Sequence, residues 1–185
     1  MRNAEINEKH MVLEGFKNVK FKDTQTLLNL VKDQVKDCCV QLFDPRFVAG
    51  FDHLYFAVLN ALKAFETGKN ISKDLAVEIL LYASGQHQIS KAIQLLGIKP
   101  GSREVAVLVL AATHEKALDA LDKVSHLLQG EQCDEIIDMT EKKVPKIKSA
   151  FDIKDEEIKA VLRNSKEQAI TSLLIERSAL LTTQI

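Results

Sequence analysis

The sequence predicts an α+β fold, with a small, mostly antiparallel four-stranded sheet packed with a cluster of about six to seven helices. Its 185 residues, 46% hydrophobic and 28% charged, are ordinary for one soluble globular domain, which we expect to span residues 1–185. The unbroken apolar run Val105–Leu110 is typical of a strand covered on both faces. Several other segments carry apolar residues at helical spacing.

The first quarter of the chain predicts a strand, a helix and a second strand. Residues 1–9 form a polar lead-in that we expect to be poorly ordered, and His10–Phe21 fits a strand with a turn at Gly15. Cys38–Phe43 is short and β-prone, so we expect the second strand there. Between them, Asp23 is placed to cap a helix. The apolar face of that helix carries Leu27, Leu28, Val31 and Val35.

The middle of the chain predicts two apolar helices. Asp44 followed by Pro45 is a strong helix start, and Phe51–Phe65 is apolar almost all round. Such a helix either lies in the core or offers apolar surface to a partner. Its thin polar stripe lies near His53, Asn60, Lys63 and Thr67. Ser72 is placed to cap the next helix, in which Glu78 needs a partner if it is buried.

The remaining elements are a central strand, a fourth strand and three helices. Arg103–Leu110 is the predicted central strand, and Thr113 starts an amphipathic helix that Gly130 closes. Gln132–Met139 fits a shorter fourth strand. A short helix is expected from Asp152 to Leu162, and the last one starts at Ser165, where Ser165 and Gln168 fit a capping box.

Composition and charge exclude several classes of protein. A net charge of −1 rules out a uniformly basic surface, so any RNA contact must rest on a local patch. Lys142–Lys148 is the densest positive segment, either a solvated face or a phosphate-contacting patch. Three cysteines without disulfide or zinc spacing indicate a reduced, intracellular protein. Since no signal peptide or membrane-length apolar run is present, we expect a soluble, cytoplasmic protein without a membrane partner.

The search for catalytic motifs gives no enzyme class. The chain has no phosphate-binding glycine loop, dinucleotide fingerprint, zinc-protease motif or nucleophile elbow. Its five histidines are scattered, so we expect neither a metal site nor a cofactor. Ser84 and His87 are close in sequence, but no acid that would orient the imidazole is apparent. We expect no catalytic residues and a protein that is not an enzyme.

One segment has the character of a binding site. In Glu78–Gly97, two apolar helical runs are joined by an uncharged polar corner. Gly85 suits the left-handed residue that closes the first helix, and the next helix is expected within a residue or two. Its unpaired backbone amides would favour an anion such as a phosphate. The side chains placed around this point are those of Ser84, Gln86, His87 and Gln88.

The same residues resemble a known family, the kinase-binding subunit of the KEOPS complex in its archaeal form. The likeness is strong over Asp44–Leu110, and its specific part is Ser-Gly-Gln-x-Gln-Ile at residues 84–89. The archaeal pattern more often has arginine where this chain has His87, an imidazole that is mostly neutral at pH 7. The resemblance implies a non-enzymatic, cytoplasmic subunit of the complex that adds threonylcarbamoyl to adenosine in tRNA. It also implies an α+β fold and two direct partners, the small atypical kinase/ATPase of KEOPS and the 3′ CCA end of tRNA.

The resemblance assigns two groups of site residues. For the CCA end, Gln86 and Gln88 would pair with base edges, helix amides would take a phosphate, and base stacking would rely on Tyr82, His87 or Ile89. The tRNA-binding set is therefore Tyr82, Ser84, Gly85, Gln86, His87, Gln88 and Ile89. For the kinase interface the set is Leu75, Ile79, Ile170, Leu173 and Leu174, for which the alternative is plain core. A regulator that binds the kinase and touches no RNA remains an alternative.

Overall fold

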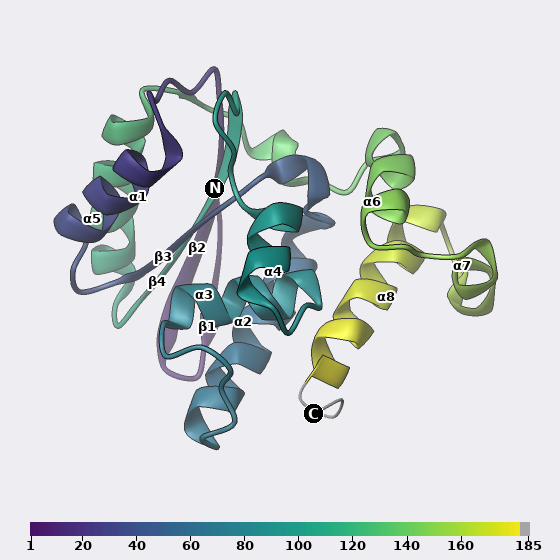
Figure 1. The fold of residues 1–185 in the computed structure, drawn as a ribbon. Coiled ribbons are helices and arrows are strands. Elements are labelled where there is room, and N and C mark those ends of the chain that lie inside the picture. The colour runs from purple at the N-terminus through teal and green to yellow at the C-terminus, as the bar shows by residue number, and fades with distance from the viewer. Residues whose placement is uncertain (182–185) are drawn as a thin grey trace. The chain divides into compact units, whose positions relative to one another are not determined.

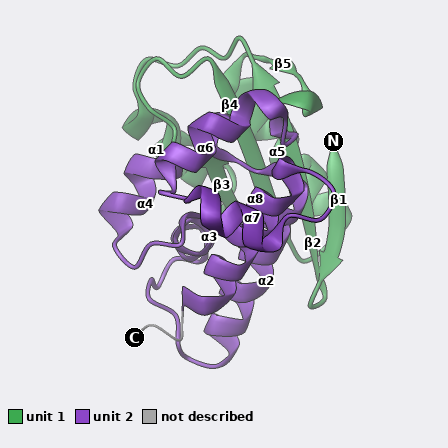
Figure 2. Ribbon diagram, turned by 90° about the vertical axis from the view of Figure 1, so that its right-hand side faces the viewer, with its two compact units in different colours: residues 1–45, 97–136 green, residues 46–96, 137–185 purple. Residues whose placement is uncertain are grey.

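The computed structural model describes residues 1–181, which form two compact units (Figures 1 and 2). Unit 1 comprises Met1–Pro45 and Gly97–Ile136, and unit 2 comprises Arg46–Leu96 together with the chain from Ile137 onward. The α+β prediction is confirmed, since unit 1 contains an antiparallel sheet and unit 2 is helical. The predicted single domain over residues 1–185 stays a prediction.

The sheet of unit 1 has five strands among the described residues, one more than predicted. They are β1 (Arg2–Ile6), β2 (Lys9–Lys17), β3 (Cys39–Phe43), β4 (Glu104–Ala111) and β5 (Glu131–Gln132). The order is β1-β2-β4-β3, and β5 pairs with β2. Every residue from Val105 to Ala111 is buried, as the unbroken apolar run predicts for a central strand.

Three predictions about strands are wrong. Residues 1–9 are not a poorly ordered lead-in, because Arg2–Ile6 pairs with β2 in a hairpin whose turn residues, Asn7 and Glu8, both have positive φ. No turn occurs at Gly15, where β2 runs straight on. A Cβ at Gly15 would lie 2.3 Å from the Cys133 carbonyl oxygen, so glycine is needed for close approach. Gln132–Met139 is not a full strand, since β5 is followed by the 3₁₀ helix η2 (Asp134–Ile137).

Two helices of unit 1 complete its core, α1 (Thr24–Gln34) and α5 (His114–Leu128). The predicted Asp23 cap is confirmed, since Asp23 accepts from the Thr26 N–H, and α5 starts after Thr113 as predicted, with Thr113 accepting from the Lys116 N–H. Gly130 does not close α5, because Gln129 takes the left-handed position. These helices pack with every second residue of β4 in one hydrophobic cluster. It includes Val105, Val107, Val109 and Ala111 from the strand, Leu27 and Val31 from α1, and Leu121 and Val124 from α5.

Unit 2 is built around α2 (Gly50–Glu66), which packs against α3 (Leu75–Ser84) and α8 (Lys166–Leu180). Helix α4 (Ile89–Leu96) packs on α3, while α6 (Val144–Ala150) and α7 (Asp155–Val161) pack on α8. Residues 1–181 thus contain eight α-helices, against the six to seven predicted.

Four details of unit 2 differ from the predictions. Asp44 and Pro45 lead into the 3₁₀ helix η1 (Pro45–Phe47), and α2 begins only at Gly50. Asp74, not Ser72, caps α3 by accepting from the N–H groups of Ala76 and Val77. His53 is not part of an exposed polar stripe, because it is fully buried. Helix α7 starts at Asp155 rather than Asp152, whose φ is positive.

Other features of unit 2 follow the sequence. Ser165 caps α8 by accepting from the Gln168 N–H, as predicted. Among residues 1–181, no helix combines the length and apolar character needed to cross a membrane.

Candidate functional site

The predicted corner between α3 and α4 lies within unit 2. Gly85 has φ 61° and ψ 29°, the left-handed conformation predicted for it. The Gly85 N–H donates to the Tyr82 carbonyl and the Gln86 N–H to the Leu81 carbonyl, at 3.2 Å each. This pattern satisfies the last carbonyls of α3 and turns the chain sharply.

The end of α3 forms one side of the corner, and the start of α4 forms the other. The Gln88 carbonyl accepts from the Ala92 N–H at 3.0 Å, which makes Gln88 the residue that precedes the helix. Within residues 1–181 no side chain caps the first turn of α4, so its N–H groups are open to solvent or a ligand. His87, Gln88 and Ile89 are exposed, and Gln86 is half-buried. The helix begins at Ile89, four residues after Gly85 and slightly later than predicted.

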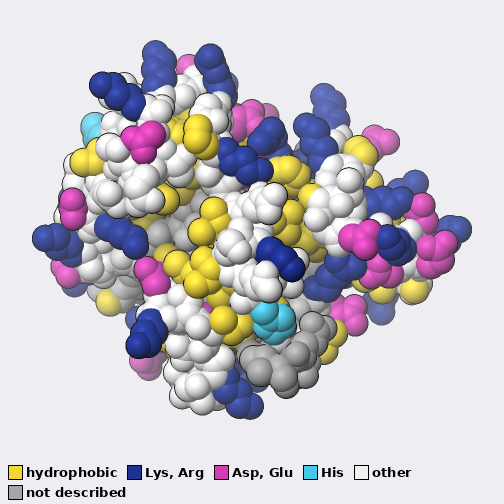
Figure 3. Space-filling model, in the orientation of Figure 1, with side chains coloured by type: hydrophobic (Ala, Val, Ile, Leu, Met, Phe, Trp, Pro, Cys, Tyr) yellow, Lys and Arg dark blue, Asp and Glu magenta, His cyan; other side chains and the backbone are white. Residues whose placement is uncertain are grey.

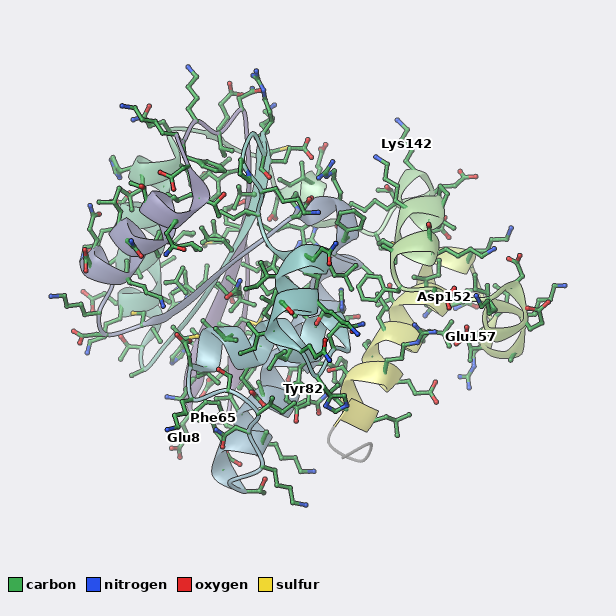
Figure 4. The ribbon with its side chains drawn as sticks, in the orientation of Figure 1. Glu8, Phe65, Tyr82, Lys142, Asp152 and Glu157 are labelled. Atoms are coloured by element: carbon green, nitrogen blue, oxygen red, sulfur yellow. The ribbon has the colours of Figure 1, made fainter. Side chains whose placement is uncertain are left out.

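Two of the proposed tRNA-binding side chains lie away from the open corner. Tyr82 is 2% exposed and sits inside the helical cluster, so its ring has no face for a base (Figure 4). Ser84 is 1% exposed, and its hydroxyl donates to the Leu81 carbonyl at 3.0 Å. The Ser84 oxygen is therefore not available to attack a ligand. The exposed set that remains is Gln86, His87, Gln88 and Ile89, beside the backbone of Gly85.

The base of the corner is held by His53 of α2. The His53 Nδ1 accepts from the Ala49 N–H at 3.1 Å, so Nε2 carries the proton and donates to the Ala83 carbonyl at 2.7 Å. Complete burial lowers the pKa of His53 to about 4, and the charge of Lys143 adds to this shift. The imidazole is therefore neutral at physiological pH and joins the start of α2 to the end of α3.

Arg177 of α8 lies directly beside the corner, and the sequence predictions did not include it. A Cβ added at Gly85 would lie 3.7 Å from the Arg177 Cβ. The guanidinium donates to the Phe151 carbonyl at 2.5 Å and to Glu157 Oε1 at 2.8 Å. Hydrogen bonds from the Lys154 N–H and from Arg177 lower the pKa of Glu157. No sequence signal marks Arg177, because it is 92 positions beyond Gly85.

Glu78 supports the other end of α3. Its carboxylate is fully buried and accepts from the N–H groups of Ile71 and Ser72, the latter at 2.7 Å. A buried carboxylate needs hydrogen-bond donors, and the backbone N–H groups of the loop that leads into α3 provide them for Glu78.

Most of the proposed kinase-interface residues are core residues. At most 6% of each side chain is exposed in Ile79, Ile170, Leu173 and Leu174. Their burial agrees with the alternative prediction that they are plain core residues. Leu75 alone is half-buried. The exposed large apolar side chains of unit 2 among residues 1–181 include Ile89 at 42% and Ile93 at 49%. These two isoleucines are four residues apart on α4 and share one face, which the sequence reasoning did not single out as a docking surface.

Among residues 1–181, no cluster of three or more histidine, cysteine, aspartate or glutamate side chains is placed to hold a metal ion. The polar chemistry of the corner therefore consists of neutral amides, one imidazole and backbone N–H groups.

Comparisons with known proteins agree with the resemblance. The sequence model of the family described as "Kinase binding protein CGI-121" matches residues 16–181. A protein of Methanocaldococcus jannaschii named "Regulatory protein Cgi121" is 34% identical over 97 residues, which are 52% of this chain and 61% of that protein. A protein of Pyrococcus abyssi named "KEOPS complex subunit Cgi121" is 40% identical over 50 residues, 27% of this chain and 29% of that protein. The matched stretch thus spans less than two thirds of either relative.

Proposed function

The chain belongs to the CGI-121 family of kinase-binding proteins, and from this premise we propose that it is a non-catalytic subunit of a KEOPS-type tRNA-modifying complex. In this proposal it binds the small kinase/ATPase of the complex and recruits tRNA through the 3′ CCA end. The name of the Pyrococcus abyssi relative supports the complex, and the family description supports the kinase. The corner between α3 and α4 is the observation that supports the RNA contact.

The exposed face of α4 is our proposed kinase-docking surface. Ile89 and Ile93 present two large apolar side chains one helical turn apart, the pattern by which a helix lies in a hydrophobic groove. Among the residues that the sequence predicts for the kinase interface, Leu75 is the one with a partly accessible side chain. The buried members, such as Ile170 at 0% exposure, would have to leave the core to make contact.

The corner offers the chemistry that a single-stranded RNA end requires. Gln86 and Gln88 carry amides that both donate and accept, as base edges demand, and the open N–H groups of α4 favour a phosphate. Since Tyr82 is buried and Ile89 belongs to the proposed kinase-docking surface, stacking falls to His87. In this proposal the corner binds the tail without reacting with it, and the buried Ser84 side chain lies out of reach of the open corner.

Binding of tRNA with and without its CCA end tests the RNA part of the proposal. We expect the intact tRNA to bind more tightly, and the substitution Gln88→Ala to remove most of that difference. Gln94→Ala, another exposed glutamine on α4, is the matched control and should leave the difference unchanged. Equal binding of both tRNAs would contradict recruitment through the CCA end.

Co-purification with the kinase tests the docking surface. Ile93→Asp should abolish co-purification and leave the fold intact, because the side chain is 49% exposed. Leu118→Asp, on α5 of unit 1 and 36% exposed, is the matched control and should still co-purify. If the Ile93→Asp variant still co-purifies with the kinase, this face of α4 is not the docking surface.

A second candidate function is a regulator that binds the kinase and no RNA. The apolar face of α4 favours it, because Ile89 and Ile93 need only a protein partner. The two tests separate the candidates: loss of kinase binding in Ile93→Asp without any CCA dependence would support the regulator alone.

A further inference from the structure

A cluster of lysines lies at the start of α6, in unit 2 but outside the corner. Lys142 and Lys146 are exposed, and the part of the chain that the structure describes offers them no acidic partner. The next lysines along the chain differ, because Lys148 pairs with Asp155 at 2.6 Å and Lys154 pairs with Asp152. Figure 3 shows dark-blue side chains standing over α6, and Figure 4 shows Lys142 extending away from the ribbon.

The fold enlarges this cluster beyond what the sequence shows. Between Lys142 and Lys146, the Lys143 Nζ donates to the Val48 carbonyl at 3.1 Å and so joins the 3₁₀ helix η3 (Glu141–Lys143) to the segment after η1. Arg46 lies in η1, with its guanidinium 5.6 Å from the centre of the Phe47 ring. Lys142, Lys143 and Lys146 form the surface that we call the basic patch, and Arg46 lies two positions before Val48, the residue that Lys143 contacts. Glu141 is the one acidic residue within 141–148.

Two independent contacts connect the basic patch to the base of the corner. Phe151 ends α6, and its carbonyl accepts from Arg177, the residue beside Gly85. The Phe151 ring also packs edge-on against His53, which holds the Ala83 carbonyl. Helix α6 therefore begins beside Lys142 and Lys143 and ends at Phe151, which contacts the residues that support the corner.

The length of α6 determines which part of an RNA the patch would meet. At the usual helical rise, Lys146, five residues before Phe151, lies about 7 Å from it along the helix axis, and Lys142 precedes the helix and lies farther away. The patch would meet nucleotides that precede the tail.

We propose that the basic patch binds phosphates of the RNA behind the CCA tail, at the end of the acceptor duplex. This inference rests on the proposed tail binding at the corner. Lysine ammonium groups act as point charges that need no particular geometry, which suits backbone phosphates and carries no sequence readout. With tail and duplex held at two places, the protein would fix the direction in which the tRNA leaves the corner.

The test compares three RNAs with the full-length chain: a short single strand ending in CCA, an acceptor-stem hairpin ending in CCA, and the same hairpin without CCA. We expect the double variant Lys142→Glu/Lys146→Glu to bind the CCA hairpin about tenfold more weakly at low salt. We also expect the slope of log affinity against log salt to fall by about 1–2 in magnitude, one phosphate contact for each lysine. Affinity for the short single strand should stay within twofold of the unmodified chain.

Matched controls keep the result specific. Lys63→Glu/Lys159→Glu changes the net charge equally on exposed lysines of α2 and α7 and should have less than a twofold effect. The neutral pair Lys142→Gln/Lys146→Gln should lose part of the hairpin affinity, and thermal unfolding should show that each variant is folded. An equal loss in the Lys63/Lys159 variant would overturn the proposal, because the effect would then come from net charge.

The outcomes also separate this inference from the function on which it rests. Unchanged hairpin binding by Lys142→Glu/Lys146→Glu, with CCA dependence intact, would overturn the basic patch alone. If the unmodified chain binds both hairpins equally and does not bind the single strand, the tail proposal fails. If the lysine variant binds RNA normally but loses the kinase, the patch is a protein interface and the RNA proposal for it is wrong.

Discussion

His53 shows how one side chain makes the corner both stable and dependent on pH. Its two ring nitrogens satisfy the Ala49 N–H and the Ala83 carbonyl, two backbone groups that the ends of α2 and α3 would otherwise leave unpaired. Only the neutral imidazole can do this, because a protonated ring has no acceptor. The helical corner therefore depends on a proton staying off His53.

The first prediction concerns acid stability. Burial lowers the pKa of His53 from the ordinary 6.5 to about 4, so below pH 6.5 the unfolded chain binds a proton that the folded chain does not. This contribution to the free energy of unfolding is complete above pH 6.5 and falls by about 1.4 kcal/mol per pH unit down to about pH 4. The total loss is about 3 kcal/mol. Urea unfolding at a series of pH values measures it.

His53→Gln is the control for acid stability. The glutamine amide keeps a donor and an acceptor but does not titrate, so this variant should show a shallower fall in stability over the same pH range. Equal slopes in the two proteins would show that other groups cause the acid sensitivity.

Glu78 carries the second prediction at this scale. Both carboxylate oxygens accept N–H groups from residues 71 and 72, and Glu78→Gln would turn an NH₂ group toward one of them. We expect the free energy of unfolding to fall by about 1–3 kcal/mol, because a buried donor would face another donor. Glu176→Gln, on the exposed side of α8, should change it by less than about 0.5 kcal/mol. Equal stability of both variants in urea would mean that Glu78 contributes no such acceptor.

Among the elements, the corner depends on one backbone conformation. Gly85→Ala should reduce the free energy of unfolding by about 1–2 kcal/mol, because its φ of 61° is unfavourable for a Cβ. Space is not the reason, since the nearest atom would be 3.7 Å away. Gly85→Asn should cost less, because asparagine tolerates the left-handed region. Thermal unfolding of the two variants gives the comparison, and an alanine variant as stable as the native protein would argue against strain.

Local signals predicted most elements but not those that depend on distant contacts. The caps at Asp23 and Ser165 and the helix start at Thr113 are predictable because each depends on a few neighbouring residues. Gly15 was mistaken for a turn, since its cause is the Cys133 carbonyl, more than a hundred residues away in sequence. β1 was missed because its pairing with β2, not its own apolar content, makes Arg2–Ile6 a strand. For the same reason, neither the position of Arg177 beside the corner nor the burial of Tyr82 can be predicted from the sequence.

At the scale of the whole molecule, the chain passes between its two units three times, after Pro45, Leu96 and Ile136. Neither unit is one continuous stretch. The helices α2, α3 and α4 come from the first stretch of unit 2, and α8, which packs against α2 and α3, comes from the second. The fold class was predictable because it depends on hydrophobic pattern, whereas this interleaving depends on which segments meet.

The interleaving predicts how fragments behave. Residues 46–96 alone should show little cooperative unfolding by circular dichroism, because Ile170, Leu173 and Leu174 of α8 would be missing from their core. Adding a peptide of residues 137–181 should restore helical signal and a melting transition. A sharp transition in the 46–96 fragment by itself would show that the first stretch folds independently.

The bridge from His53 to the Ala83 carbonyl has a further consequence, for the entropy of binding. The turn at Gly85 is anchored by hydrogen bonds to its own helix and, through the Ala83 carbonyl, by His53 of α2, so its backbone has few alternative conformations to lose. A ligand that enters the corner would order itself but would require little ordering of the protein. Association should therefore resemble rigid docking, with nearly the same backbone in the free and occupied states.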